Sequence, residues 1–120
     1  YLILIYLNEK EMDAMPEAEM SALNARHLNL NDRLRASGHF IEAEALEPAS
    51  ATACVRIRNG KAMITDGPFT ESKEMVAGFY LIEARDLNEA TQVAASIPSL
   101  PLGTIEVRPT RQLIVDGMEP

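Results

Sequence analysis

The chain has 120 residues, with 18 acidic and 11 basic side chains and a formal net charge of −7. At this length we expect one domain, residues 1–120, with enough chain for a two-layer core. The acidic balance argues against a nucleic-acid partner, because phosphate binding depends on clustered Lys and Arg. No apolar run approaches the roughly 18 residues of a membrane span, so no membrane partner is expected.

Cysteine usage favours a reducing compartment. The single cysteine, Cys54, cannot form an internal disulfide, which fits a cytoplasmic location. Cys54 has no His or Asn partner in a known motif, so we interpret it as a packed, inert thiol. The apolar start, residues 1–7, is followed by acids and lacks a basic region and a cleavage site, so we do not expect a signal peptide.

The first predicted strand, residues 1–7, is apolar at both odd and even positions. A strand with one wet face would alternate, so this strand is expected to be covered on both faces. An acidic connection (8–14) follows, and a helix is predicted from Pro16 to Ser37 with Gly38 as its stop. Its apolar stripe, spaced three and four residues apart, consists of Met20, Leu23, His27, Leu30 and Leu34.

His27 has two interpretations within this stripe. The first is an interior histidine, neutral and bonded to a backbone carbonyl. The second is a general base in a partly dry pocket, where burial lowers the pKa of the imidazole and keeps it neutral at pH 7. The residues alone leave both interpretations open.

A strand is predicted over residues 39–46, with Glu42 and Glu44 on one parity. Their two-residue spacing marks a solvent or pocket face. The two histidines, His27 and His39, are distant in the sequence, and no Cys–His spacing accompanies them, so no metal site is predicted. No phosphate loop, nucleophile elbow or zinc signature is present, and no cofactor is predicted.

A hairpin is predicted in the middle of the chain. The segments 55–58 and 62–65 flank Asn59-Gly60, and both of these residue types accept positive φ at little cost.

The motif Asp-Gly-Pro-Phe at residues 66–69 should end the strand, because Pro68 has no N–H and disfavours helix before it. One interpretation is a structural turn held by Asp66, with Phe69 in the core. The other places the Asp66 carboxylate at the rim of a pocket, where it orients a base or accepts a proton.

The C-terminal half is predicted to contain a strand, a helix and a last strand. Residues 78–82 are apolar on both parities and predict a second interior strand. Asp86 and Glu89 form a capping box for a second helix, which Pro98 ends. The segment 105–108 alternates as a last strand, and residues 111–115 are expected to add an edge strand or a tail.

The segments ITDGPFTESKEMVAGFYLIEARDLNEA and IEVRP, with the opening YLILIY and the helix start PEAEM, resemble the YCII-related family in its DGPF-motif branch. The resemblance covers nearly the whole chain. It implies a ferredoxin-like α+β fold of the dimeric α/β barrel type, in a family whose members mostly lack an assigned activity. It also implies a His–Asp pair in a cleft of some members. His27-Leu28 matches the helix histidine of several members, which the DGPF branch does not demand.

The order of elements predicts two helices on one face of an antiparallel sheet. Since two strands are apolar on both faces, a second copy of the chain is the simplest cover for the other face, giving a homodimer. A cavity between or beside the sheets is the expected small-molecule site. Its candidate lining consists of His27, Asp66, Tyr6, Tyr80 and Phe69.

Two functions are compatible with this pattern. The first is a small-molecule pocket with His27 as general base and Asp66 as its partner, in an elimination, isomerisation or hydrolysis. The second is a non-catalytic regulatory or metabolite-sensing module, which the resemblance links to extracytoplasmic sigma-factor systems. A purely structural interaction protein is a third. The residues do not decide whether the chain is an enzyme, and they name no substrate.

Overall fold

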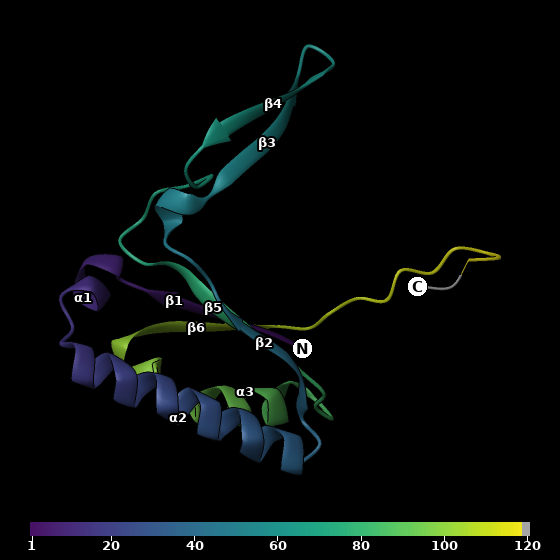
Figure 1. Cartoon of the computed structure of the whole chain (residues 1–120). Helices are drawn as coiled ribbons and strands as arrows, with labels where there is room; N and C mark the ends of the chain where they lie inside the picture. The colour runs from purple at the N-terminus through teal and green to yellow at the C-terminus, as the bar shows by residue number, and fades with distance from the viewer. Residues whose placement is uncertain (119–120) are drawn as a thin grey trace.

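A four-stranded antiparallel sheet and two long helices form the body of the protein. The computed structural model describes residues 1–118. The strands β1 (Leu2–Leu7), β2 (Phe40–Ala45), β5 (Met75–Ile82) and β6 (Gly103–Arg108) follow the order β2-β5-β1-β6 across the sheet. The helices α2 (Glu17–Ala36) and α3 (Leu87–Ala95) lie on one face of it (Figure 1). This confirms the predicted α+β, ferredoxin-like class, with both predicted helices on one face.

The core lies between the sheet and these two helices. Along β1 the odd residues Ile3, Ile5 and Leu7 are buried, and β5 adds Tyr80 and Ile82. The alternation follows from the period of two in a strand. The predicted stripe of α2 is confirmed, since Leu23, Leu30 and Leu34 are buried and Met20 and His27 are half-buried.

Residues 8–14 differ from the expected connection, because they contain a short helix, α1 (Glu9–Asp13). Asn8 is its N-cap, and the Asn8 Oδ1 accepts a hydrogen bond from the Glu11 backbone N–H at 3.1 Å. Glu9 and Glu11 lie near the positive end of this helix. A helix of five residues has too few turns to show an apolar period, which is why the sequence did not predict it.

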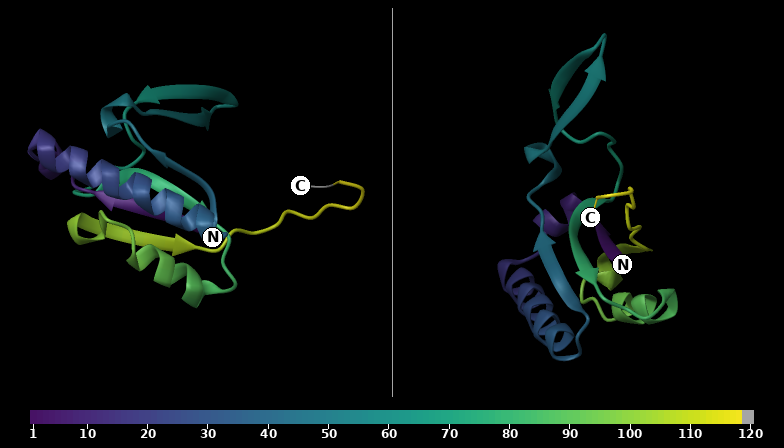
Figure 2. Two further views of the ribbon diagram at one scale, coloured as in Figure 1. Left: turned by 60° about the horizontal axis from the view of Figure 1, so that its bottom comes forward. Right: turned by 90° about the vertical axis from the view of Figure 1, so that its right-hand side faces the viewer.

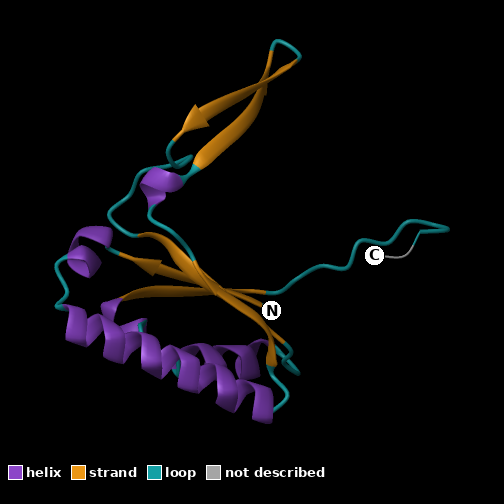
Figure 3. Cartoon of the chain, viewed as in Figure 1, coloured by secondary structure: helices purple, strands orange, loops and turns teal. Residues whose placement is uncertain are grey.

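The face of the sheet away from α2 and α3 is open among the residues that the structure describes (Figure 3). The even residues of β1 lie on it, opposite the odd residues of β5, in the pairs Leu2–Leu81 and Leu4–Phe79. These side chains are half-buried. The order of the strands confirms that β1 and β5 are central, and a cover for their second face stays a prediction.

The predicted hairpin is confirmed as β3 (Ala53–Arg58) and β4 (Lys61–Asp66), joined by Asn59 and Gly60 with φ of 51° and 75°. It follows a short 3₁₀ turn, η1 (Ala49–Ala51), and is inserted between β2 and β5. The hairpin forms its own two-stranded sheet and extends away from the body (Figures 1 and 2). We call β3 and β4 the arm.

The C-terminal segment leaves the body after β6, which itself follows a 3₁₀ turn, η2 (Leu100–Leu102). Residues 109–118 run outward as a tail with one isolated bridge, between Val115 and Met118 (Figure 2). Of the two expectations for this segment, the tail is correct. Among the described helices, none combines the length and the apolar character that a membrane crossing requires.

Candidate functional site

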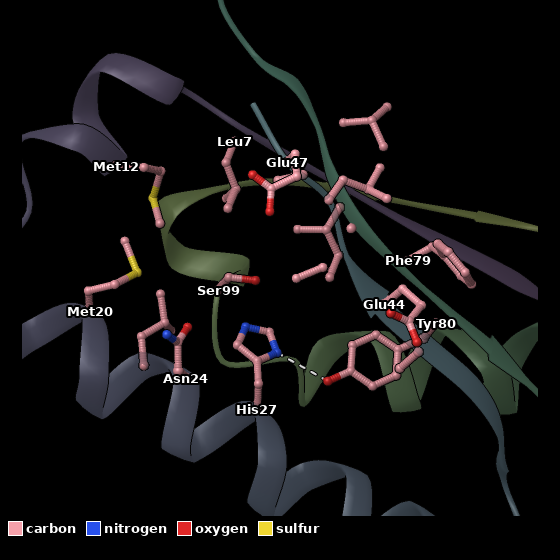
Figure 4. A pocket seen from close by; sticks show the side chains of 18 of the residues that line it. Leu7, Met12, Met20, Asn24, His27, Glu44, Glu47, Phe79, Tyr80 and Ser99 are labelled. Atoms are coloured by element: carbon pink, nitrogen blue, oxygen red, sulfur yellow. Dashed lines mark hydrogen bonds between the residues drawn. The ribbon is translucent and has the colours of Figure 1, made fainter. Parts of the chain in front are cut away.

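A cavity of about 510 Å³ lies beside α2 and the sheet and reaches α1 and the segment that follows β2. Its walls are largely apolar. They include Leu7 of β1, Met12 of α1, and Met20 and Leu23 of α2 (Figure 4). A concave apolar space with a few polar groups is the usual form of a small-molecule site.

His27 and Tyr80 meet in this cavity. The apolar stripe of α2 places His27 on the sheet side of the helix, and the alternation of β5 directs Tyr80 to the same side. The His27 Nδ1 lies 3.1 Å from the Tyr80 Oη, within hydrogen-bond distance (Figure 4). The two rings are stacked, with centroids 6.2 Å apart. The other ring nitrogen, Nε2, is directed into the cavity, on the side where Ser99 lies.

Both members of this pair are neutral at pH 7. Burial lowers the pKa of His27 from its ordinary value of 6.5, and the positive charge of Arg26 lowers it further. Burial raises the pKa of Tyr80 to about 12. The phenol therefore keeps its proton, and the bond has two proton arrangements. When Nδ1 carries the hydrogen and donates it to the Tyr80 oxygen, Nε2 has a free lone pair that faces the cavity.

Two further lining residues each carry a buried polar atom without a hydrogen-bond partner in the described chain, the Ser99 Oγ and the Asn31 Oδ1. Ser99 is only 1% exposed, and its hydroxyl points into the cavity (Figure 4). An unsatisfied buried polar group destabilises the folded chain by about 1–3 kcal/mol. A ligand that forms hydrogen bonds with these atoms would remove that penalty. Sequence reasoning missed Ser99. Its one signal is its place between Pro98 and Pro101, in a stiff loop.

Asp66 is not part of the cavity lining. It is an exposed residue at the end of β4, on the arm, and it does not line this cavity in the part of the chain that the structure describes. The turn after it is held to β3, because the Gly67 N–H donates to the Thr52 carbonyl at 2.7 Å and the Cys54 Sγ donates to the Gly67 carbonyl at 3.2 Å. The predicted shared pocket of His27 and Asp66 is therefore not formed within the described chain.

Phe69 and Tyr6 also lie away from His27. Phe69 is 73% exposed, and its ring centroid is 5.4 Å from the Arg56 guanidinium, so the interpretation that buried it in the core is wrong. The reason is that the arm stands away from the body. Tyr6 is an even residue of β1 and faces the open side of the sheet, where its hydroxyl donates to Glu106 at 3.4 Å. Of the predicted lining, the structure brings together His27 and Tyr80.

Residues 1–118 contain no group of three or more His, Cys, Asp or Glu side chains arranged to hold a metal ion. His39, the second histidine, lies at the other end of α2. Its Nε2 is 2.9 Å from the Glu89 Oε1, and its Nδ1 is 2.7 Å from the Ser37 Oγ. These bonds connect the end of α2 to α3, and they indicate a structural role for His39.

Comparison with known proteins places this arrangement in a family. The model of the YCII-related domain matches residues 1–114. The chain belongs to the YCII-related domain family. This YCII-related domain is 31% identical to an uncharacterized protein of Rhizobium meliloti (strain 1021) over 118 residues, which covers 91% of this chain and 90% of that protein. These matches identify the family of the domain, and they assign no activity to it.

Proposed function

We propose that this YCII-related domain binds a small molecule in the cavity of His27 and Tyr80 and transfers a proton to or from it. The observation that carries the proposal is the 3.1 Å contact between the His27 Nδ1 and the Tyr80 Oη, with the second ring nitrogen directed into the same cavity. The lowered pKa of His27 supports it, because a general base must be unprotonated at the working pH.

In the proposed chemistry, His27 Nε2 accepts a proton from the bound molecule, and Nδ1 donates its hydrogen to the Tyr80 oxygen. Tyr80 takes the place of the carboxylate that the sequence suggested for Asp66, as the group that fixes the ring and its tautomer. Proton removal begins both eliminations and isomerisations, and activation of a water molecule begins a hydrolysis. The candidate reactions are therefore those of a lyase, an isomerase or a hydrolase.

A thermal-shift screen of metabolites tests this proposal. A ligand at about 100 times its Kd stabilises a protein by about 2.7 kcal/mol, which is a readily measured shift. We expect compounds that stabilise the wild type to stabilise Asp66→Asn equally and to have little effect on His27→Ala. Compounds that stabilise His27→Ala as strongly as the wild type contradict the site. Loss of the shift in Asp66→Asn alone would restore the His–Asp pair that the sequence suggested.

We also propose that a second copy of the chain covers the open face of the sheet, with the arm taking part. The half-buried Leu2, Leu4 and Phe79 on this face support the proposal, as does the arm, on which Ile57 is 70% exposed. Burial of such apolar surface is the main favourable term in association.

The Asp-Gly-Pro-Phe motif at residues 66–69 supports the proposal that the chain belongs to the DGPF branch of the family.

Light scattering after size-exclusion chromatography measures the assembly. At micromolar concentrations we expect a particle of twice the chain mass of 13.2 kDa. The substitution Leu4→Lys places a charge on the open face and should give a single-chain particle. The matched control is Leu87→Lys on α3, on the opposite side of the sheet, which should leave the mass unchanged. A wild-type particle of single-chain mass contradicts the proposal.

A further inference from the structure

The cavity of His27 is bordered by acidic side chains and by no Lys or Arg among the described residues. The lining residues in the described chain include the carboxylates of Glu9, Asp13 and Glu47. Glu44 of β2 also borders the cavity, but its side chain lies on the open face of the sheet with that of its pair partner, Phe79. Glu9 is partly engaged, since its Oε1 accepts a hydrogen bond from the Ala49 N–H at 2.7 Å. Glu47 follows β2 and lies at the rim, near Leu7 (Figure 4). Such a boundary attracts cations and repels anions.

The unpartnered atoms of the cavity lining are compatible with the same kind of ligand. The Asn31 Oδ1 is an acceptor only, and the Ser99 Oγ can accept as well as donate. His27 Nε2 is a third acceptor when Nδ1 donates to Tyr80. These atoms can accept N–H groups of a ligand, although the Ser99 hydroxyl and the Asn24 amide of the lining can also donate. A protonated amine offers two or three such groups, and a carboxylate offers none.

The apolar part of the cavity lining indicates the chemistry of the rest of the ligand. Met12, Met20 and Leu23 contribute apolar lining, and methionine side chains adapt to different apolar shapes. A compound with an apolar body and one amine would place the amine at Ser99 and Asn31 and the body against this wall.

We propose that the cavity takes a cationic amine carried on an apolar body. The inference rests on the proposed small-molecule site and names its ligand class. It explains the bordering acids and the two buried unpartnered oxygens with one group. A neutral His27 beside the amine adds no repulsion, and its Nε2 is placed to accept an N–H.

Isothermal titration calorimetry with three compounds of the same shape tests the charge: benzylamine, benzyl alcohol and benzoate. We expect benzylamine to bind at least tenfold more tightly than benzyl alcohol, and benzoate not to bind. The affinity for benzylamine should fall severalfold between about 0.02 M and about 0.3 M salt, because salt screens charges near the surface. The affinity for benzyl alcohol should stay constant.

Two variants locate the effect. Glu47→Gln should lower the affinity for benzylamine about threefold, which is the size of one carboxylate–ammonium interaction at the solvent-facing rim. It should leave the affinity for benzyl alcohol unchanged. The matched control is Glu71→Gln, which removes the same charge from an exposed residue outside the cavity lining. Ser99→Ala should weaken benzylamine about tenfold, through the loss of a hydrogen bond to a charged group.

The outcomes separate this inference from the proposed function. Binding of benzoate, or equal affinity for benzylamine and benzyl alcohol, overturns the amine preference while the site stands. Failure of benzylamine to bind, when the metabolite screen gives compounds that depend on His27, also overturns the inference alone. Absence of any ligand in both the screen and this series overturns the proposed function, and the inference with it.

Discussion

His27 is a histidine in a stripe of leucines, and its contact with Tyr80 shows how two local periods converge. The helix period brings one side chain to the sheet, and the strand period brings the other to the helix. The stripe predicted where His27 points. The partner at 3.1 Å was not predictable as a contact, because it depends on how residues 27 and 80, distant in the sequence, pack together.

The lowered pKa of His27 makes stability depend on pH. Between the lowered pKa of the folded state and the ordinary value of 6.5, the unfolded chain binds more protons at this residue than the folded chain does. Stability from this residue is therefore constant above pH 6.5 and falls as the pH decreases below it. Urea unfolding from pH 7 to pH 5 should show a steeper loss for the wild type than for His27→Gln. Equal slopes would contradict the assignment.

Ser99 gives a prediction that separates stability from binding. Its hydroxyl is buried without a partner in the described chain, so Ser99→Ala should raise the free energy of unfolding by about 1 kcal/mol, or about 4 °C in Tm. The control is Ser96→Ala, which removes a bond that the Ser96 Oγ does make, to the Val93 carbonyl at 2.6 Å. That variant should be less stable by about 0.5–1 kcal/mol. Calorimetry measures the stability of both variants. A loss of stability in Ser99→Ala would contradict the conclusion that the Ser99 hydroxyl has no hydrogen-bond partner.

At the scale of elements, the sequence was most informative where a pattern is local. The apolar run of β1, the stripe of α2 and the Asn59-Gly60 turn each predicted an element at nearly its observed bounds, and the run at residues 78–82 predicted the C-terminal part of β5. The position of the arm was not predictable. Its orientation depends on the links before β3 and after β4, whose residues show no periodic pattern. Asp66 and Phe69 were placed in the cavity for that reason, although the arm carries them away from it.

The packing of β6 on β1 requires a glycine. A Cβ on Gly103 would overlap the Tyr6 carbonyl oxygen and press against the Leu7 side chain. Gly103→Ala should therefore lower the free energy of unfolding by about 3 kcal/mol, as severe overpacking does. The neighbouring Thr104→Ala, at an exposed position, should change it by less than about 0.5 kcal/mol. Denaturant unfolding compares the two, and equal stability of both variants would contradict the close approach.

At the scale of the whole molecule, the chain is extended for its length. Its radius of gyration is 16.9 Å, against about 13.6 Å for a compact domain of this size. The outward course of the arm and of the tail accounts for the difference (Figure 1). A two-stranded hairpin is marginally stable by itself in water, so the arm needs contacts beyond those that its own strands provide.

Hydrogen exchange tests whether a second copy supplies these contacts. At dilutions that favour single chains, amides of β3 and β4 should exchange much faster than those of β1, which lies inside the sheet. Their protection should rise with protein concentration, whereas that of β1 should stay constant. The variant Leu4→Lys should keep the fast exchange of the arm at every concentration. Protection of the arm that does not depend on concentration would argue against the partner.

The link between β2 and the arm has a mechanical consequence. Leu46, Glu47 and Pro48 border the cavity, and the arm begins five residues after Pro48, at Ala53. A movement of the arm would therefore be transmitted to the border of the cavity through the short link of residues 49–52. If the proposed dimer grips the arm and the proposed ligand enters by this border, the two events are coupled through residues 46–52.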